Sequence, residues 1–163
     1  MKKSSICIGD SGAIISLAII GKLDLLDFWF DNIYIPEAVW CELIENDNFV
    51  EVLSIKSFFA KRVKKIQTIN DLKLIMDKGE SEAVILYREM NADVLLIDDK
   101  KAKEIAKKIG VQCIGVLTLL AKSKDANVID NLRNIFLQLI ENKRYFSKQL
   151  LNSILREFNE KPI

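Results

Sequence analysis

Short apolar runs alternate with longer amphipathic segments along most of the chain. The run at residues 6–8 has a β-branched residue at each end and is followed by Gly9-Asp10-Ser11-Gly12. This pattern indicates a buried strand, a turn and then a helix over residues 13–18. Further strands are expected at residues 32–35, 66–69, 94–97 and 112–114. Because strands and helices alternate, the pattern predicts an α/β protein with a parallel sheet covered on both faces.

Helical spacing of apolar residues predicts the segments between these strands. Pro36 is expected to be the first residue of the helix that follows the second strand. Val50, Leu53 and the pair Phe58-Phe59 predict a helix that basic residues close. The remaining helices are expected at residues 23–29, 71–76, 79–87, 100–109 and 116–122.

The alternation ends after residue 122. Residues 128–140 and 147–158 predict two amphipathic helices, with Ser147 as the N-cap of the second. Each carries an apolar stripe that has to be buried. The stripes either pack on their own domain, or join two subunits, or receive a helix of a partner. We expect residues 1–163 to form a single domain, because this length suits one core.

The composition narrows the chemistry that the protein can perform. The chain has no histidine, which excludes Ser-His and Cys-His nucleophiles and histidine metal ligands. Its three cysteines are too widely spaced for a disulfide framework or a zinc site. Catalysis therefore has to use carboxylates, lysines, hydroxyl groups or a bound ion. The net charge is +1, but basic clusters occur at residues 61–65, 100–103 and 107–108.

The chain carries no apolar run that is long enough to span a bilayer without a charge. Asp10 interrupts the apolar segment that follows Lys2 and Lys3, so that segment does not resemble a signal peptide. We therefore expect a cytoplasmic protein that does not use a membrane.

Acidic residues follow two of the predicted strands. Asp10 follows the first strand and Asp98-Asp99 follow the strand at residues 94–97. The carboxyl ends of parallel strands meet at one edge, where ligands bind in open α/β sheets. Glu42 and Glu80 lie on helices that could reach the same edge. Carboxylates that converge there repel one another unless a cation is present, and oxygen ligands suit Mg²⁺ or Mn²⁺.

These acidic residues also have a purely structural interpretation. Asp10 or Ser11 could simply cap the first helix, and Glu80 suits the positive end of a helix dipole. The basic clusters could likewise be solvated surfaces.

Four segments in the same order resemble a PIN domain: residues 9–15, 36–42, 79–83 and 95–99. The likeness is greatest to short prokaryotic PIN proteins related to VapC-type toxins. It covers about residues 5–125 and leaves residues 128–160 as a helical extension. The resemblance implies a three-layer α/β/α sandwich with strand order 3-2-1-4-5.

The resemblance also implies a ribonuclease site that uses one or two Mg²⁺ or Mn²⁺ ions. The residues that match the catalytic metal ligands of the family are Asp10, Glu42, Glu80 and Asp98. Ser11 matches the neighbouring hydroxyl, Asp99 is an accessory candidate, and Glu82 is a weaker one. Many relatives carry aspartate where this chain has Glu80, and the longer side chain suits a water-bridged contact.

The leading hypothesis is therefore a metal-dependent endoribonuclease that hydrolyses RNA phosphodiester bonds as the toxin of a toxin–antitoxin pair. RNA, a small antitoxin protein and a second copy of the chain are the expected partners. One alternative is a non-catalytic PIN-like protein that binds nucleic acid or acts as a scaffold. Another is a flavodoxin-like signalling module with Asp10 as phosphoacceptor. That module would need paired acids after the first strand, whereas the pair here is Asp98-Asp99.

Overall fold

A parallel five-stranded sheet forms the centre of the computed structural model, which describes residues 5–45 and 51–163. The strands are arranged in the order β3-β2-β1-β4-β5, and every neighbouring pair is parallel. This confirms the α/β class and the strand order that the resemblance implies. The strands are β1 (Ile6–Gly9), β2 (Asn32–Pro36), β3 (Val63–Lys64), β4 (Val94–Leu96) and β5 (Cys113–Ile114).

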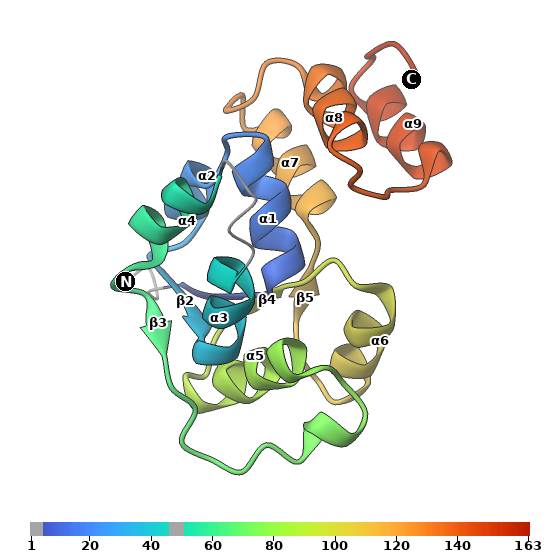
Figure 1. The fold of residues 1–163 in the computed structure, drawn as a ribbon. Helices are drawn as coiled ribbons and strands as arrows, with labels where there is room; N and C mark the ends of the chain where they lie inside the picture. The colour runs from blue at the N-terminus through green and yellow to red at the C-terminus, as the bar shows by residue number, and fades with distance from the viewer. Residues whose placement is uncertain (1–4, 46–50) are drawn as a thin grey trace.

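Helices cover both faces of the sheet. In Figure 1, α1 and α7 lie on one side of the strands, and α5 and α6 lie on the other. The last two helices, α8 and α9, lie beyond α7 at the far end of the molecule. The helices are α1 (Ser11–Ile19), α2 (Asp24–Trp29), α3 (Glu37–Glu45), α4 (Val52–Phe59), η1 (Leu72–Leu74), α5 (Lys78–Glu89), α6 (Lys100–Lys108), α7 (Val116–Asp125), α8 (Leu132–Glu141) and α9 (Lys148–Glu157).

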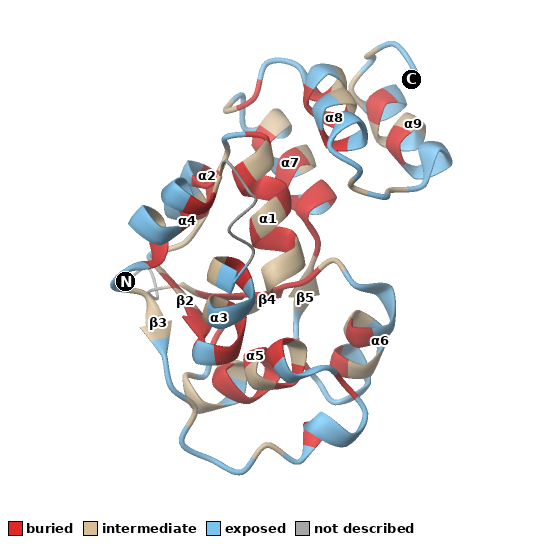
Figure 2. Ribbon diagram, in the orientation of Figure 1, coloured by how far each residue is buried: buried red, intermediate tan, exposed pale blue. Residues whose placement is uncertain are grey.

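Two apolar cores lie on opposite faces of the sheet because successive strand residues point to opposite sides. Cys7 belongs to the core on the α1 face, whereas Ile8 belongs to the core on the α5 face. Along β4, Leu95 and Leu96 alternate in the same way. Figure 2 shows the buried residues concentrated where the helices face the strands. None of the helices in the described part of the chain has the length and apolar character needed to cross a membrane.

The apolar stripes of α8 and α9 are largely buried in the core on the α1 face. Leu132 and Phe136 of α8 and Leu151 and Leu155 of α9 are fully buried there. The C-terminal helices therefore pack on the chain's own core. Ser147 caps α9 as expected, because its side chain accepts a hydrogen bond from the Leu150 N–H.

The third strand was predicted at residues 66–69, and this prediction is wrong. The strand lies at Val63–Lys64, beside the end of β2. The N–H groups of Gln67 and Thr68 donate to the Glu89 carboxylate at 2.8 and 2.7 Å, so they are not available to a sheet ladder.

Two helix starts also differ from the prediction. Pro36 is the last residue of β2 and pairs with Lys64, so the helix begins one residue later. The helix expected from residue 128 begins at Leu132, because the Asn131 side chain caps it there. Val50 lies outside the described residues, and so do Lys2 and Lys3.

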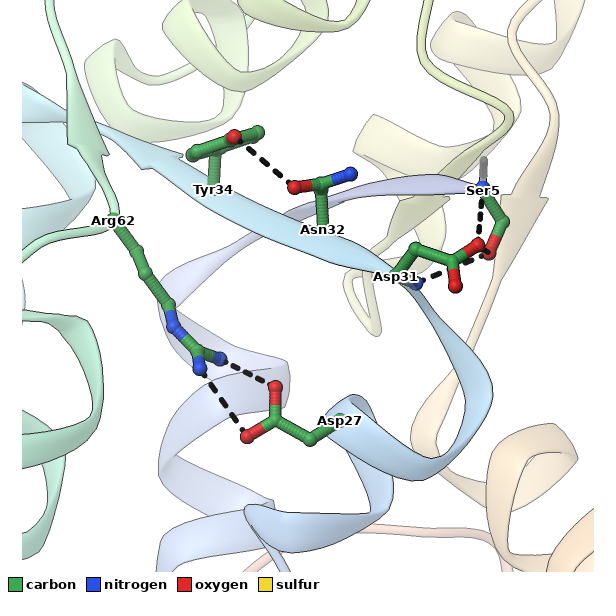
Figure 3. Close-up of polar contacts among 6 residues, drawn as sticks. All are labelled: Ser5, Asp27, Asp31, Asn32, Tyr34 and Arg62. Atoms are coloured by element: carbon green, nitrogen blue, oxygen red, sulfur yellow. Dashed lines mark hydrogen bonds and ion pairs between the residues drawn. The ribbon is translucent and has the colours of Figure 1, made fainter. Parts of the chain in front are cut away.

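Polar contacts fix the amino ends of β1 and β2, at the edge opposite the predicted site. Figure 3 shows Asp31 accepting hydrogen bonds from the backbone and hydroxyl of Ser5. The same view shows the Arg62 guanidinium paired with both carboxylate oxygens of Asp27, at 2.8 and 3.2 Å. Arg62 belongs to the basic cluster at residues 61–65, and its charge is thus used within the fold.

Candidate active site

The carboxyl ends of β1 and β4 bring the predicted acidic residues to one place. Gly9 pairs with Leu96, and the Asp10 N–H donates to the Leu96 carbonyl at 2.9 Å. A cavity of about 670 Å³ opens at this edge. All six predicted site residues line it. The lining is Asp10, Ser11, Gly12, Glu42, Asp77, Glu80, Asp98, Asp99, Lys100, Lys143, Arg144, Tyr145 and Phe146.

Asp10 is the most deeply buried acid of the site, with 4% of its surface exposed. It caps α1, because its carboxylate accepts a hydrogen bond from the Gly12 N–H at 3.2 Å. Burial raises its pKa to about 7, and the negative charges of Glu80 and Glu42 act in the same direction. Asp10 is thus both a helix cap and the floor of an acidic cavity.

Asp98 follows β4 and lies against the beginning of α7. Its Oδ1 accepts a hydrogen bond from the Val116 N–H at 2.8 Å. A Cβ at Gly115 would lie 2.9 Å from this oxygen, so glycine permits the close approach. Burial raises the pKa of Asp98, against the effect of the Val116 N–H and the charges of Lys103 and Arg144. Its other oxygen, Oδ2, is buried and has no hydrogen-bond partner among the described residues.

The two glutamates reach the cavity from α3 and α5. The Ser11 hydroxyl donates to Glu42 Oε2 at 2.6 Å, which links α1 to α3. The carboxylate of Glu42 lies so close to Gly79 that a Cβ there would force the end of the Glu42 side chain to move. Burial raises the pKa of Glu80, and the nearby charge of Asp99 raises it further.

The remaining acidic candidates differ in position. Asp99 lines the cavity and caps α6 by accepting a hydrogen bond from the Ala102 N–H at 2.8 Å. Glu82 does not line the cavity. Its carboxylate accepts from the Ala38 N–H at 3.2 Å and supports the beginning of α3.

One wall of the cavity comes from residues 143–146, which sequence reasoning did not connect with the site. These residues join α8 to α9. Arg144 Nε donates to the Ser16 hydroxyl at 2.9 Å, and its Nη2 donates to the Gly12 carbonyl at 2.8 Å. The signal in the sequence is Lys143-Arg144-Tyr145-Phe146, two cations followed by two aromatic residues between amphipathic helices. Asp77 also lines the cavity and was not predicted from the sequence.

The donor set fits a hard divalent cation, because it consists of carboxylate and hydroxyl oxygens and Asp98 Oδ2 lacks a partner. Within residues 5–45 and 51–163, however, no group of three or more His, Cys, Asp or Glu residues is arranged to hold a metal ion. Gly12, Val116 and Ser11 donate hydrogen bonds to the carboxylates of Asp10, Asp98 and Glu42, respectively. A cation that gathers these side chains has to compete with those contacts.

Comparison with known proteins supports one family. No curated protein matches the chain. A family model described as a PIN domain matches residues 6–160, which extends through α8 and α9. PIN domains are generally nucleases, and they typically use divalent metal ions. The family match and the parallel sheet of order 3-2-1-4-5 agree, and the chain belongs to the PIN domain family.

Proposed function

We propose that this protein is a divalent-metal-dependent endoribonuclease that hydrolyses phosphodiester bonds of RNA. The observation that carries the proposal is the convergence of four carboxylates from different elements on one cavity at the strand ends. The proposed catalytic metal ligands are Asp10, Glu42, Glu80 and Asp98. The buried Asp10 lies close enough to two of the other acids for their charges to raise its pKa. A site of this kind is stabilised by positive charge.

The side chains around the cavity have separate tasks in this proposal. Mg²⁺ or Mn²⁺, when bound by the acids, supplies positive charge to the scissile phosphate and activates water. Ser11 orients Glu42 through its 2.6 Å hydrogen bond. Lys100, Lys143 and Arg144 also line the cavity. They attract the phosphate backbone, which an acidic floor alone would repel. Asp99 holds the beginning of α6 and belongs to the accessory residues.

The Glu80 and Glu82 pair gives a matched test. Both lie on α5, but only Glu80 lines the cavity.

End-labelled RNA oligonucleotides, and DNA of the same sequence, are incubated with each protein in Mn²⁺, Mg²⁺ or EDTA. We expect the native chain to cleave RNA with metal but not with EDTA. Glu80→Gln and Asp10→Asn should each lower the rate by about 100-fold or more, since both remove a ligand. Glu82→Gln should stay within about threefold of the native rate. Equal rates for all three variants would refute the assignment.

We further propose that the nuclease is the toxin of a toxin–antitoxin pair and acts in the cytoplasm. The support is the likeness of its four motifs to the VapC-related branch, and its three cysteines are unpaired. Induced expression of the native chain should arrest growth, and Asp10→Asn should relieve the arrest. A small neighbouring gene whose product restores growth would identify the antitoxin. Normal growth during expression of active nuclease would contradict a toxin.

The structure also favours a second candidate, a PIN-like protein that binds nucleic acid or acts as a scaffold without turnover. Asp10, Asp98 and Asp99 each accept a hydrogen bond from the first turn of a helix, which is a structural task. The described residues also form no ready metal-binding group. This candidate predicts that RNA binds to the native chain but remains intact in Mn²⁺.

A further inference from the structure

The part of the cavity lining that follows α8 has a defined backbone conformation. After α8 ends, the Lys143 N–H donates to the Ile140 carbonyl and the Arg144 N–H donates to the Leu139 carbonyl, both at 2.9 Å. Lys143 has a φ of 59°, the left-handed conformation that closes many helices. The chain therefore leaves α8 in a defined direction.

The side chains on both sides of Tyr145 are anchored. Arg144 is tied to α1 through Ser16 and Gly12. Phe146 packs against the core on the α1 face. Between these two anchors, Tyr145 lines the cavity, and the residue is 91% exposed. An aromatic ring is thus presented to solvent at the edge of the acidic cavity on a backbone that is held in place.

The charges beside this ring suit a polyanion. Lys143 precedes Arg144 and also lines the cavity. The two engaged nitrogens of Arg144 are Nε and Nη2, and its Nη1 has no protein acceptor among the described residues. Cations together with an exposed aromatic ring are the combination that binds nucleic acid strands, because the cations contact phosphates and the ring stacks on base faces.

We propose that residues 143–145 form a nucleotide-binding subsite beside the acidic cavity. Tyr145 stacks on an unpaired nucleobase next to the scissile phosphate, and Lys143 binds a phosphate of the same strand. This inference rests on the proposed function and extends it, since it assigns substrate binding to the connection between α8 and α9. A duplex hides its base faces, so the subsite selects a single-stranded segment.

The first test measures binding without cleavage. Every protein carries Asp10→Asn, so that the strand stays intact, and a fluorescent single-stranded RNA oligonucleotide is titrated in Mg²⁺ and followed by anisotropy. Tyr145→Ala should weaken binding roughly 5- to 100-fold, because stacking on one base is lost. Tyr145→Phe keeps the ring and should bind within about twofold of the parent. Phe28→Ala is the matched control, because Phe28 is also an exposed aromatic residue but does not line the cavity.

The second test separates the ring from the charge. Lys143→Asn removes the positive charge and keeps a residue that tolerates a positive φ. It should lower the slope of log affinity against log salt by about one, whereas Tyr145→Ala should leave this slope unchanged. Melting temperatures of the Lys143 and Tyr145 variants should match that of the parent, because both residues are exposed.

The outcomes distinguish this inference from the proposed function. If native protein cleaves RNA but Tyr145→Ala binds as tightly as the parent, only the nucleotide subsite is overturned. The same holds if Phe28→Ala weakens binding as much as Tyr145→Ala, or if a blunt duplex binds as well as the single strand. If the native chain neither binds nor cleaves RNA, the subsite and the nuclease are both overturned.

Discussion

At the scale of the residue, the surroundings of Asp10 disfavour its ionised form. Burial and the charges of Glu80 and Glu42 raise its pKa from 3.8 to about 7. The unfolded chain thus releases this proton at a lower pH than the folded chain does. Between about pH 4 and pH 7 the folded state binds more protons, so the contribution of Asp10 to folding stability falls as pH rises.

The raised pKa of Asp10 predicts how the melting temperature of the metal-free protein depends on pH. The melting temperature of the native chain, relative to Asp10→Asn, should fall between about pH 5 and pH 8. A change of about 1 kcal/mol corresponds to roughly 2–4 °C for a chain of this size. Thermal melts in EDTA at both pH values provide the measurement. If the melting temperatures of the two proteins change with pH in parallel, ionisation of Asp10 does not destabilise the fold.

At the scale of the element, Glu160 holds the beginning of α8. Its two carboxylate oxygens accept hydrogen bonds from the N–H groups of Leu132 and Arg133, at 3.0 and 2.7 Å. Lys124 Nζ lies 3.2 Å from Oε1. Partial burial opposes ionisation, but these partners outweigh it and lower the pKa of Glu160. A lowered pKa stabilises the fold above the ordinary value near 4.5, and this stability is lost as pH falls through the folded-state value.

Glu160→Ala should therefore destabilise the protein near neutral pH by about 1 kcal/mol, as the loss of a helix cap does. The melting temperature should fall by roughly 2–4 °C at pH 7, and the difference should shrink at about pH 3. Glu157→Ala serves as the control, because Glu157 is an exposed residue of α9. A loss that is equally large at both pH values would show that the charge of Glu160 is not responsible.

The prediction of elements succeeded where local patterns decide the structure. Apolar runs identified β1, β2 and β4, and the Ser147 hydroxyl caps α9 as its place in the sequence predicts. It failed at β3, where the carboxylate of Glu89 captures backbone N–H groups more than twenty residues away in sequence. Arg144 was missed for the same reason, because its partners Ser16 and Gly12 are distant in sequence and no periodicity links them. The acids at the strand ends could be predicted from the alternation of strands and helices, but the strand order and the role of each acid came from the family resemblance, which local patterns do not supply.

At the scale of the whole molecule, a divalent ion should stabilise the fold. An ion that binds only the assembled carboxylates raises the melting temperature by mass action. We expect Mn²⁺ and Mg²⁺ at millimolar concentration to raise the melting temperature of the native chain, and to have a smaller effect on Asp10→Asn. A thermal scan without any shift would count against a metal site.

The homodimer stays a prediction, and the structure indicates which residues can test it. Leu155 is fully buried, so a polar residue there would damage the core. Ile140 and Leu150 are 39% and 49% exposed, and they are the apolar positions of α8 and α9 that a partner can reach. Light scattering at micromolar concentration should report a dimer that Ile140→Gln with Leu150→Gln converts to a monomer. A monomeric native chain would end the dimer proposal.

The contact between Arg144 and α1 has a consequence for biosynthesis. A ribosome makes a chain from its amino end, so all four proposed metal ligands are synthesised before Arg144, which lies 132 residues after Gly12. A nascent chain that has reached α7 already holds the acids but still lacks the wall with Lys143 and Tyr145. In the proposed nuclease, the residues assigned to substrate capture are thus synthesised after all four acids, and the cavity is complete only when both parts are present.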